Sequence, residues 1–230
     1  AWLSMSDWDK CGETPRPNLE SLKGKPCYIG LDLASVSDFA CISLMFPLEG
    51  GKVAQYVYSF LPEDTIEDKA GHLSRLYKTW LQDGYITTTE GNVNDLKYMK
   101  ERILGFCEEF NVREIAYDPW GGSELSADLL DKGLPMIKVG QGMGSMSGPS
   151  KSYEGLVKSQ KLVHGNDPVV NWMASNCEAW IDINENIKVR KGNPSNKIDG
   201  VVASIMALGR LEINGGLKES AYATRGIRVI

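Results

Sequence analysis

The chain has 230 residues, of which 24% are charged, and its formal net charge is −5 at pH 7. This length suits one α/β domain with a full core, and the acidic balance is not typical of nucleic-acid-binding proteins, which usually carry a basic footprint. No apolar run approaches the roughly 18 residues of a membrane span. The first residues lack the basic and apolar regions of a signal peptide, so we expect a cytoplasmic protein.

Cysteine and histidine usage argues against disulfide and zinc chemistry. The five cysteines are widely spaced and form no CxxC pair, so we expect them to be reduced. The two histidines, His72 and His164, show no metal-ligand spacing. We expect both to lie on the surface or in loops.

The first part of the chain predicts an antiparallel meander. Residues 1–25 contain prolines and glycines without clean periodicity and are expected to form a linker or arm. Three strand-like runs follow, separated by SVSD and by LEGG, whose glycine pair suits a hairpin turn. These runs are Pro26–Ala34, Phe39–Pro47 and Lys52–Leu61.

The middle of the chain predicts helices alternating with parallel strands. Apolar residues at helical spacing indicate one helix from about Pro62 to Gly84 and another from Val93 to Phe110. A short strand then ends at Asp118, and the helix SELSADLLDKG and the strand PMIKVGQ follow. This order predicts an α/β fold in which a mixed sheet, a meander plus parallel strands, is flanked by helices.

The last part of the chain begins with a glycine- and serine-rich stretch, Gly140–Ser150, which does not match the phosphate-loop pattern GxxxxGK[ST]. We expect either a flexible flap near a site or an ordinary loop. Beyond it the sequence predicts helical segments over Lys151–Lys161 and Pro168–Trp180, a hairpin over 182–193, and a final helix over Lys197–Asn214.

Three aspartates stand where apolar structure is expected around them: Asp32 within the first strand, Asp118 at the end of the fourth, and Asp199 in the first turn of the last helix. A buried carboxylate is costly unless a cation or donor network compensates it. If the first and fourth strands are neighbours and the last helix crosses them, the three carboxylates converge. A helix N-terminal acid favoured by the macrodipole is the plainer interpretation of Asp199 alone.

Such a cluster suits Mg²⁺ or Mn²⁺, since hard divalent cations prefer oxygen ligands. Two ions together stabilise the attacking and leaving oxygens of a phosphodiester displacement, so no histidine base is needed. Between Lys138 and Lys197, eight lysines and arginines stand against five acids, which predicts a phosphate-binding stretch or, alternatively, a solvated mixed face. The candidate DNA-binding residues there are Lys151, Lys158, Lys161, Arg190 and Lys191.

Five segments in order, GLDLASVSDFA, AYDPWGG, KVGQG, LVHGNDPVVNWMASN and KIDGVVASIMAL, resemble the nuclease domain of the large terminase subunit of tailed double-stranded DNA bacteriophages. The resemblance runs from about Tyr28 to Leu211. It implies an RNase H-like nuclease domain over residues 26–230. It also implies that Asp32, Asp118 and Asp199 are metal-binding catalytic acids that cut concatemeric viral DNA during genome packaging, with low sequence preference.

The same resemblance suggests roles for four further residues. Asp38 matches an acid that follows the first catalytic one, and is either an outer-shell or alternative ligand or a turn residue. Lys197 matches a lysine of the family, and it either contacts the scissile phosphate or is simply solvated. Gln141 and Asn176 are expected near the site. The implied partners are DNA, the terminase small subunit, the portal protein and an ATPase domain of the same polypeptide, whose Walker motif this sequence lacks.

Two other functions fit parts of the sequence. GLDLAS also resembles the first phosphate loop of actin-like ATPases and sugar kinases, although DPWGG is a poor second phosphate loop. A non-catalytic docking module of a packaging motor is the third hypothesis, and it leaves the three inward-facing acids without a compensating partner. Metal-dependent endonuclease activity in the host cytoplasm is the function that the sequence favours.

Overall fold

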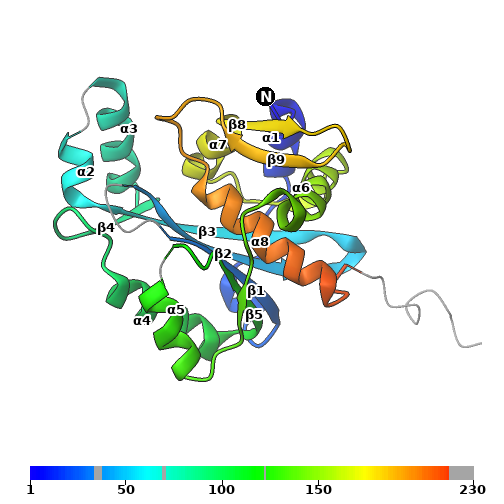
Figure 1. Ribbon diagram of the computed structural model, residues 1–230, viewed down its shortest axis with the longest axis horizontal. Helices are drawn as coiled ribbons and strands as arrows, with labels where there is room; N and C mark the ends of the chain where they lie inside the picture. Colours follow the sequence, from blue (N-terminus) through cyan, green and yellow to red (C-terminus); the bar gives the residue numbers. More distant parts are fainter. Residues whose placement is uncertain (34–37, 69–70, 122, 218–230) are drawn as a thin grey trace, which may run out of the picture.

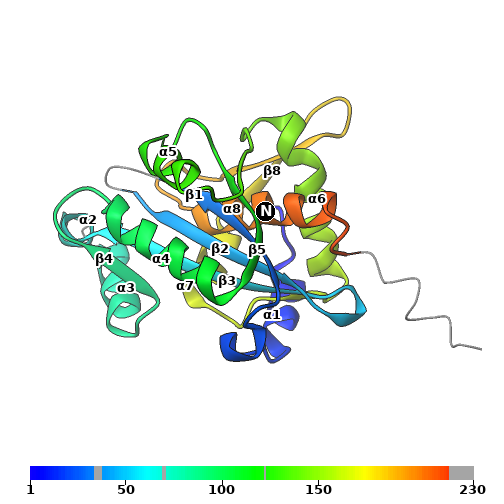
Figure 2. The ribbon, with the colours of Figure 1, turned by 90° about the horizontal axis from the view of Figure 1, so that it is seen from below.

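The computed structural model describes residues 1–33, 38–68, 71–121 and 123–217. Within these residues the centre is a mixed seven-stranded sheet in the order β4-β3-β2-β1-β5-β6, with β7 paired to the start of β3 (Figures 1 and 2). A separate hairpin pairs β8 with β9. The strands are β1 (Pro26–Asp32), β2 (Ala40–Pro47), β3 (Val53–Pro62), β4 (Ile86–Thr89), β5 (Asn111–Tyr117), β6 (Met136–Lys138), β7 (Leu162–Val163), β8 (Cys177–Ile181) and β9 (Ile187–Lys191).

The predicted meander and parallel strands are confirmed. β1 pairs with β2, and β2 with β3, in antiparallel register. The β2–β3 turn uses Gly50 and Gly51 at φ 70° and 69°, in the left-handed region that glycine tolerates best. β5 lies parallel to β1, with Leu31 opposite Tyr117, and β6 continues the sheet in parallel. The first and fourth predicted strands are therefore neighbours, and their carboxyl ends share one edge.

Helices cover both faces of the sheet. On one face, α4 and α5 bury apolar side chains that include Met99, Ile103 and Leu129. On the other face, α8 lies across the sheet, with α6, α7 and α1 around it (Figure 1). None of the helices in the described residues is long and apolar enough to cross a membrane. The helices are α1 (Met5–Glu13), α2 (Glu63–Asp68), α3 (Gly71–Gln82), α4 (Leu96–Glu109), α5 (Ser123–Asp131), α6 (Met143–Lys158), α7 (Pro168–Ser175) and α8 (Asp199–Ile213), with short 3-10 turns at Leu19–Leu22 and Glu49–Gly51.

The backbone of α8 rests directly on β1. A Cβ atom at Gly30 would lie 1.9 Å from the carbonyl oxygen of Ala203, so only glycine permits this approach. Every residue of α8 from Asp199 to Gly209 is buried, which explains why its sequence is apolar on nearly all sides. This contact sets the position of the α8 N-terminus relative to the end of β1.

The first 25 residues differ from the expected linker or arm. They contain α1, whose Trp8 is fully buried, and the amide of Trp2 donates to the carbonyl of Cys177. The Trp8 ring stacks on His164 at 4.1 Å. That histidine lies in the loop after β7, one of the two expected settings, but it is only 1% exposed. Burial of large aromatic rings gives this segment a fixed place in the core despite its weak periodicity.

The expected flap or loop over Gly140–Ser150 is wrong for most of its length, because α6 begins at Met143 and continues to Lys158. Glycine, serine and Pro149 are poor helix formers, but packing overrides propensity here. Met146, Ser147 and Ser150 are buried, and a Cβ at Gly209 of α8 would lie 2.8 Å from the Pro149 ring. The close approach of two helices therefore stabilises a sequence that would not form a helix alone.

Several shorter elements differ from the prediction, which included neither β4 nor β7. The helix expected over Pro168–Trp180 ends at Ser175, and its last part forms β8, which pairs with β9. The hairpin therefore spans 177–191 and not the expected 182–193. Asn176 caps the C-terminus of α7, and β8 begins at the next residue, Cys177. Residues 69–70 of the helix expected from Pro62 to Gly84, and residues 34–37 at the end of the first predicted strand and in the turn after it, lie outside the described residues.

Candidate active site

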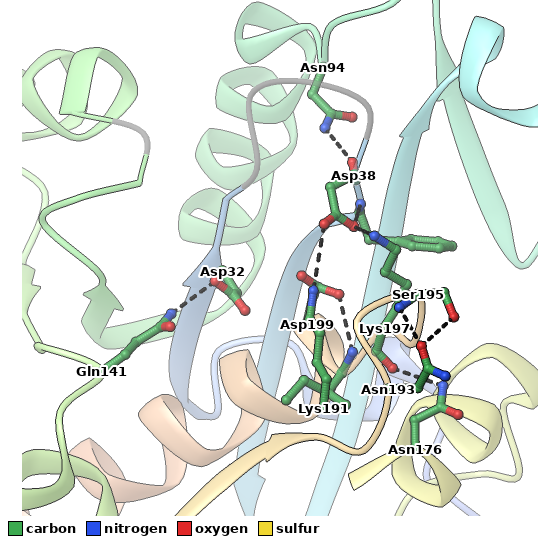
Figure 3. A network of polar contacts seen from close by, with 12 residues as sticks. Asp32, Asp38, Asn94, Gln141, Asn176, Lys191, Asn193, Ser195, Lys197 and Asp199 are labelled. Carbon is green, nitrogen blue, oxygen red and sulfur yellow. Dashed lines mark hydrogen bonds and ion pairs between the residues drawn. The ribbon is translucent and has the colours of Figure 1, made fainter. Parts of the chain in front are cut away.

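A small cavity lies where β1 ends and α8 begins. It has a volume of about 190 Å³. Asp32 is the last residue of β1 and Asp199 the first residue of α8, and both line this cavity. Lys188 and Lys191 of β9 and Gln141 complete its polar lining. Figure 3 shows Gln141 reaching Asp32 from one side, and Lys191 of β9 and Lys197 of the following loop near Asp199 on the other.

Hydrogen bonds position both aspartates. The Gln141 side-chain amide donates to Asp32 Oδ1 at 2.9 Å. Asp199 Oδ2 accepts the backbone N–H of Ile198 at 3.2 Å, and Asp199 is only 8% exposed. The Asn176 side chain donates to the Lys197 carbonyl at 3.1 Å, so it fixes the loop that leads into α8. Both predicted site-proximal residues, Gln141 and Asn176, therefore contact the site or its supporting loop.

Burial and mutual repulsion make the two carboxylates reluctant to ionise. Burial is the main cause that raises the pKa of Asp32 to about 7, and the negative charge of Asp199 adds to the shift while the Gln141 hydrogen bond opposes it. Burial also raises the pKa of Asp199, with the charge of Asp38 as the next cause. Two adjacent acids with raised pKa values are typical of a site that binds a cation or performs chemistry.

The nearby lysines form ion pairs with Asp38, and their charges only partly offset the raised pKa values: Lys191 lowers the pKa of both carboxylates, and Lys197 lowers that of Asp199. Lys197 Nζ lies 2.7 Å from Asp38 Oδ1, and Lys191 Nζ lies 3.6 Å from Asp38 Oδ2. The amide of Phe39 also donates to Asp38 Oδ1 at 2.8 Å. Among the described residues, no lysine or arginine forms an ion pair with Asp32 or Asp199. In this arrangement Asp38 anchors two lysines beside the site (Figure 3), and Lys197 faces Asp38.

Asp118 lies at the same edge of the sheet but apart from the cavity. It follows β5, the strand next to β1, and its charge contributes a smaller part of the raised pKa of Asp32, after burial and Asp199. Asp118 Oδ1 accepts the backbone N–H of Trp120 at 3.3 Å. In the described part of the chain, no three acidic, histidine or cysteine side chains are grouped closely enough to hold one metal ion. The structure thus brings Asp32 and Asp199 together and leaves Asp118 beside them.

The candidate DNA-binding residues are dispersed. Of these only Lys191 lines the cavity. Lys158 pairs with Glu154, and Arg190 pairs with Glu178, while Lys151 is exposed on α6. Lys161 lies near Gly51, at the end of the sheet opposite the cavity.

Lys188 is the cavity-lining cation that the candidate set omits. It is an exposed residue of β9 that alternates with the buried Ile187 and Val189. This alternation was visible in the predicted hairpin, so the strand pattern carried the signal that would have identified it.

Comparison with known proteins places these features in a family. The family model described as "Terminase large subunit, endonuclease domain" matches residues 1–214. The protein YmfN of Escherichia coli K12 is 30% identical over 220 residues, covering 91% of this chain and 48% of that protein. The terminase large subunit of Enterobacteria phage HK97 is 27% identical over 210 residues, covering 90% and 41%. The chain therefore spans about half or less of these relatives.

Solved structures give the same result for the fold. The crystal structure of the HK97 large terminase matches with a TM-score of 0.80 at 27% identity, covering 90% of this chain and 43% of that one. The large terminase nuclease of the thermophilic phage G20c with bound magnesium matches with a TM-score of 0.60 at 14% identity, covering 91% and 98%. These matches confirm the RNase H-like fold. The chain belongs to the family of terminase large subunit endonuclease domains.

Proposed function

We propose that this chain is a metal-dependent endonuclease that hydrolyses phosphodiester bonds of double-stranded DNA, with Asp32, Asp118 and Asp199 as its catalytic carboxylates. The observation that carries the proposal is the pair of carboxylates, Asp32 and Asp199, in one cavity without an ion-pair partner among the described residues. Uncompensated buried acids destabilise a fold, so their presence favours a function that requires them.

The donor set fits a hard divalent cation. Aspartate oxygens are the ligands that Mg²⁺ and Mn²⁺ prefer, and the described residues of the cavity offer no cysteine or histidine for a softer metal. Two carboxylates hold Mg²⁺ only together with water and phosphate oxygens. The expectation is therefore that the site is completed by DNA, with Asp118 joining from β5. Structures of G20c nuclease relatives with magnesium, cobalt and zinc support divalent metal use.

Bound cations would supply charge stabilisation for the attacking and leaving oxygens of an in-line displacement. The residues of this chain then have distinct tasks. Asp32 and Asp199 bind the cations, and Gln141 holds Asp32 in one orientation through its 2.9 Å hydrogen bond. Lys188 and Lys191, on the cavity wall, suit contacts to DNA phosphates. Phosphate contacts carry no sequence information, which favours cutting with low sequence preference.

The biological setting is part of the same proposal. In a terminase large subunit this domain would cut concatemeric viral DNA in the host cytoplasm during genome packaging. An ATPase domain of the same polypeptide, the terminase small subunit and the portal protein would be its partners. The support is membership of the family and the coverage of less than half of the HK97 terminase.

The test is incubation of supercoiled plasmid with the purified chain in EDTA, Mg²⁺ or Mn²⁺. We expect cutting only with a divalent cation, and loss of cutting in Asp32→Asn, Asp118→Asn and Asp199→Asn. Asp83→Asn, which changes an exposed acid beyond α3, is the matched control and should cut normally. Undiminished cutting by both Asp32→Asn and Asp199→Asn would refute the assignment.

The alternatives have distinct signatures. A nucleotide-dependent increase in melting temperature, without metal-dependent cutting, would favour the actin-like or sugar-kinase-like hypothesis. Absence of both effects, in a folded protein, would favour the docking module. No feature of the described residues supports either alternative over the nuclease.

A further inference from the structure

Trp120 is the most exposed tryptophan among the described residues. Its side chain is 94% exposed. By contrast, Trp2, Trp8 and Trp80 are at most 8% exposed, and Trp180 is 50% exposed. A single exposed apolar residue is common on protein surfaces, so exposure alone assigns no role. The position and the anchoring of Trp120 distinguish it from an ordinary surface residue.

The turn that carries Trp120 is tied to the candidate active site at two points. The backbone N–H of Trp120 donates to Asp118 Oδ1 at 3.3 Å, and the N–H of Gly121 donates to the Asp118 carbonyl at 3.2 Å. Gly121 also packs on the end of β1, since a Cβ there would lie 2.7 Å from the carbonyl oxygen of Leu33. Leu33 directly follows Asp32, so the turn is held between two of the proposed catalytic residues.

We infer that Trp120 is a DNA-contacting residue that holds the duplex against the catalytic edge through its indole ring; this inference rests on the proposed nuclease function. Since Gly121 lies against Leu33, the residue after Asp32, a duplex that places a phosphate near Asp32 comes close to the Asp118–Gly121 turn. In a duplex the base faces are covered by neighbouring base pairs, so an indole ring packs on the deoxyribose faces, which are the same at every sequence, whereas Lys188 and Lys191 suit only the phosphates. Contact with DNA would also remove a large apolar surface from water.

The chemistry of this contact gives it a specific signature. An uncharged indole displaces no counterions from DNA, so its removal weakens binding without changing the slope of log K against log salt. Removal of a phosphate-binding lysine lowers that slope by about one. Backbone N–H donation to Asp118 survives any change of the Trp120 side chain, so the orientation of the carboxylate is kept in the variants.

The experiment measures binding of a fluorescent duplex by anisotropy in EDTA, where no cutting occurs, between about 50 and 200 mM salt. The variants are Trp120→Ala and Trp120→Phe, with Tyr85→Ala as the matched control. Tyr85 is 42% exposed and precedes β4, the edge strand far from Asp32. Lys188→Ala is the reference for a phosphate contact. Melting temperatures are expected to be unchanged in Trp120→Ala because its side chain packs on little.

We expect Trp120→Ala to weaken binding about 10-fold, the effect of losing roughly 55 Å² of apolar surface buried against the DNA, with the salt slope unchanged. Trp120→Phe should restore most of the affinity, and Tyr85→Ala should bind normally. Wild-type affinity in Trp120→Ala, or an equal loss in Tyr85→Ala, would overturn the inference, as would a wild-type chain that binds no DNA.

Parallel cutting assays in Mg²⁺ and Mn²⁺ separate this inference from the proposed function. If the wild type binds DNA but never cuts, and Trp120→Ala binds weakly, the DNA contact is supported while the nuclease proposal fails. If the wild type cuts and Trp120→Ala binds as tightly as the wild type, the inference fails and the nuclease proposal stands.

Discussion

Neutralising Asp32 should stabilise the metal-free protein. The fold raises the pKa of the Asp32 carboxyl from the ordinary 3.8 to about 7. Each tenfold change in proton affinity is worth about 1.4 kcal/mol, so the ionised carboxylate destabilises the native state by about 4 kcal/mol above pH 7. Asp32→Asn removes the charge and keeps an oxygen that accepts the Gln141 hydrogen bond. Since burial of the amide also costs free energy, we expect a net gain of about 1–3 kcal/mol in the free energy of unfolding at pH 8.

The pH dependence of this gain has a definite sign. Below about pH 3.8 the Asp32 carboxyl is protonated in both states, and the penalty is absent. As the pH rises the unfolded state loses its proton first, so the penalty grows up to about pH 7 and is constant above it. The difference between Asp32→Asn and wild type should therefore increase with pH from about 4 to 7.

Urea denaturation followed by tryptophan fluorescence in EDTA, at a series of pH values, measures this difference. Asp83→Asn, an exposed acid, should show no such dependence. Saturating Mg²⁺ at about 100 times its Kd should stabilise the wild type by about 2.7 kcal/mol and leave Asp32→Asn nearly unchanged. A variant that is less stable than the wild type at pH 8, or a difference that does not vary with pH, would refute the reasoning.

Three further predictions concern the surroundings of the site. Gly30→Ala forces a Cβ into the Ala203 carbonyl and should destabilise the domain by at least about 2 kcal/mol, measured by urea denaturation; a stability equal to wild type would contradict the direct contact of α8 with β1. Asp38→Asn removes a charge that raises the pKa of Asp199, so an NMR titration without metal should find that pKa lowered; a higher value would reverse the argument. His164 accepts a hydrogen bond from one backbone N–H and donates one to a backbone carbonyl. Burial lowers its pKa, so its contribution to the free energy of unfolding is complete above about pH 6.5 and is lost as the pH falls through the lowered pKa. His164→Gln should therefore reduce the slope of the free energy of unfolding against pH in that range, measured by urea denaturation.

The sheet and its crossing helix were predictable because their apolar runs match strand and helix periods. Asp32 interrupts one such run, and Asp199 opens another, so the sequence marked both carboxylates. The closeness of the two carboxylates then depends on the pairing of β1 with β5 and on the position of α8. These inferences depend on local pattern and on general rules of strand order.

The features that the sequence did not predict depend on contacts between distant segments. α6 forms where Pro149 meets Gly209, and no local propensity indicates a helix at its N-terminal half. The pairing of Lys197 with Asp38 joins two loops, whereas the sequence suggested a phosphate contact or a solvated lysine. Trp8 and the buried His164 likewise find each other only in the folded chain.

The direct contact of α8 with β1 has a consequence for when the protein acquires its chemistry. Asp32 is synthesised before Asp199, so a nascent chain cannot bring the two carboxylates together until α8 has left the ribosome and settled over Gly30. Formation of the cavity therefore waits for the docking of α8 on the sheet. A chain that stopped before α8 would hold Asp32 without the second acid of the pair.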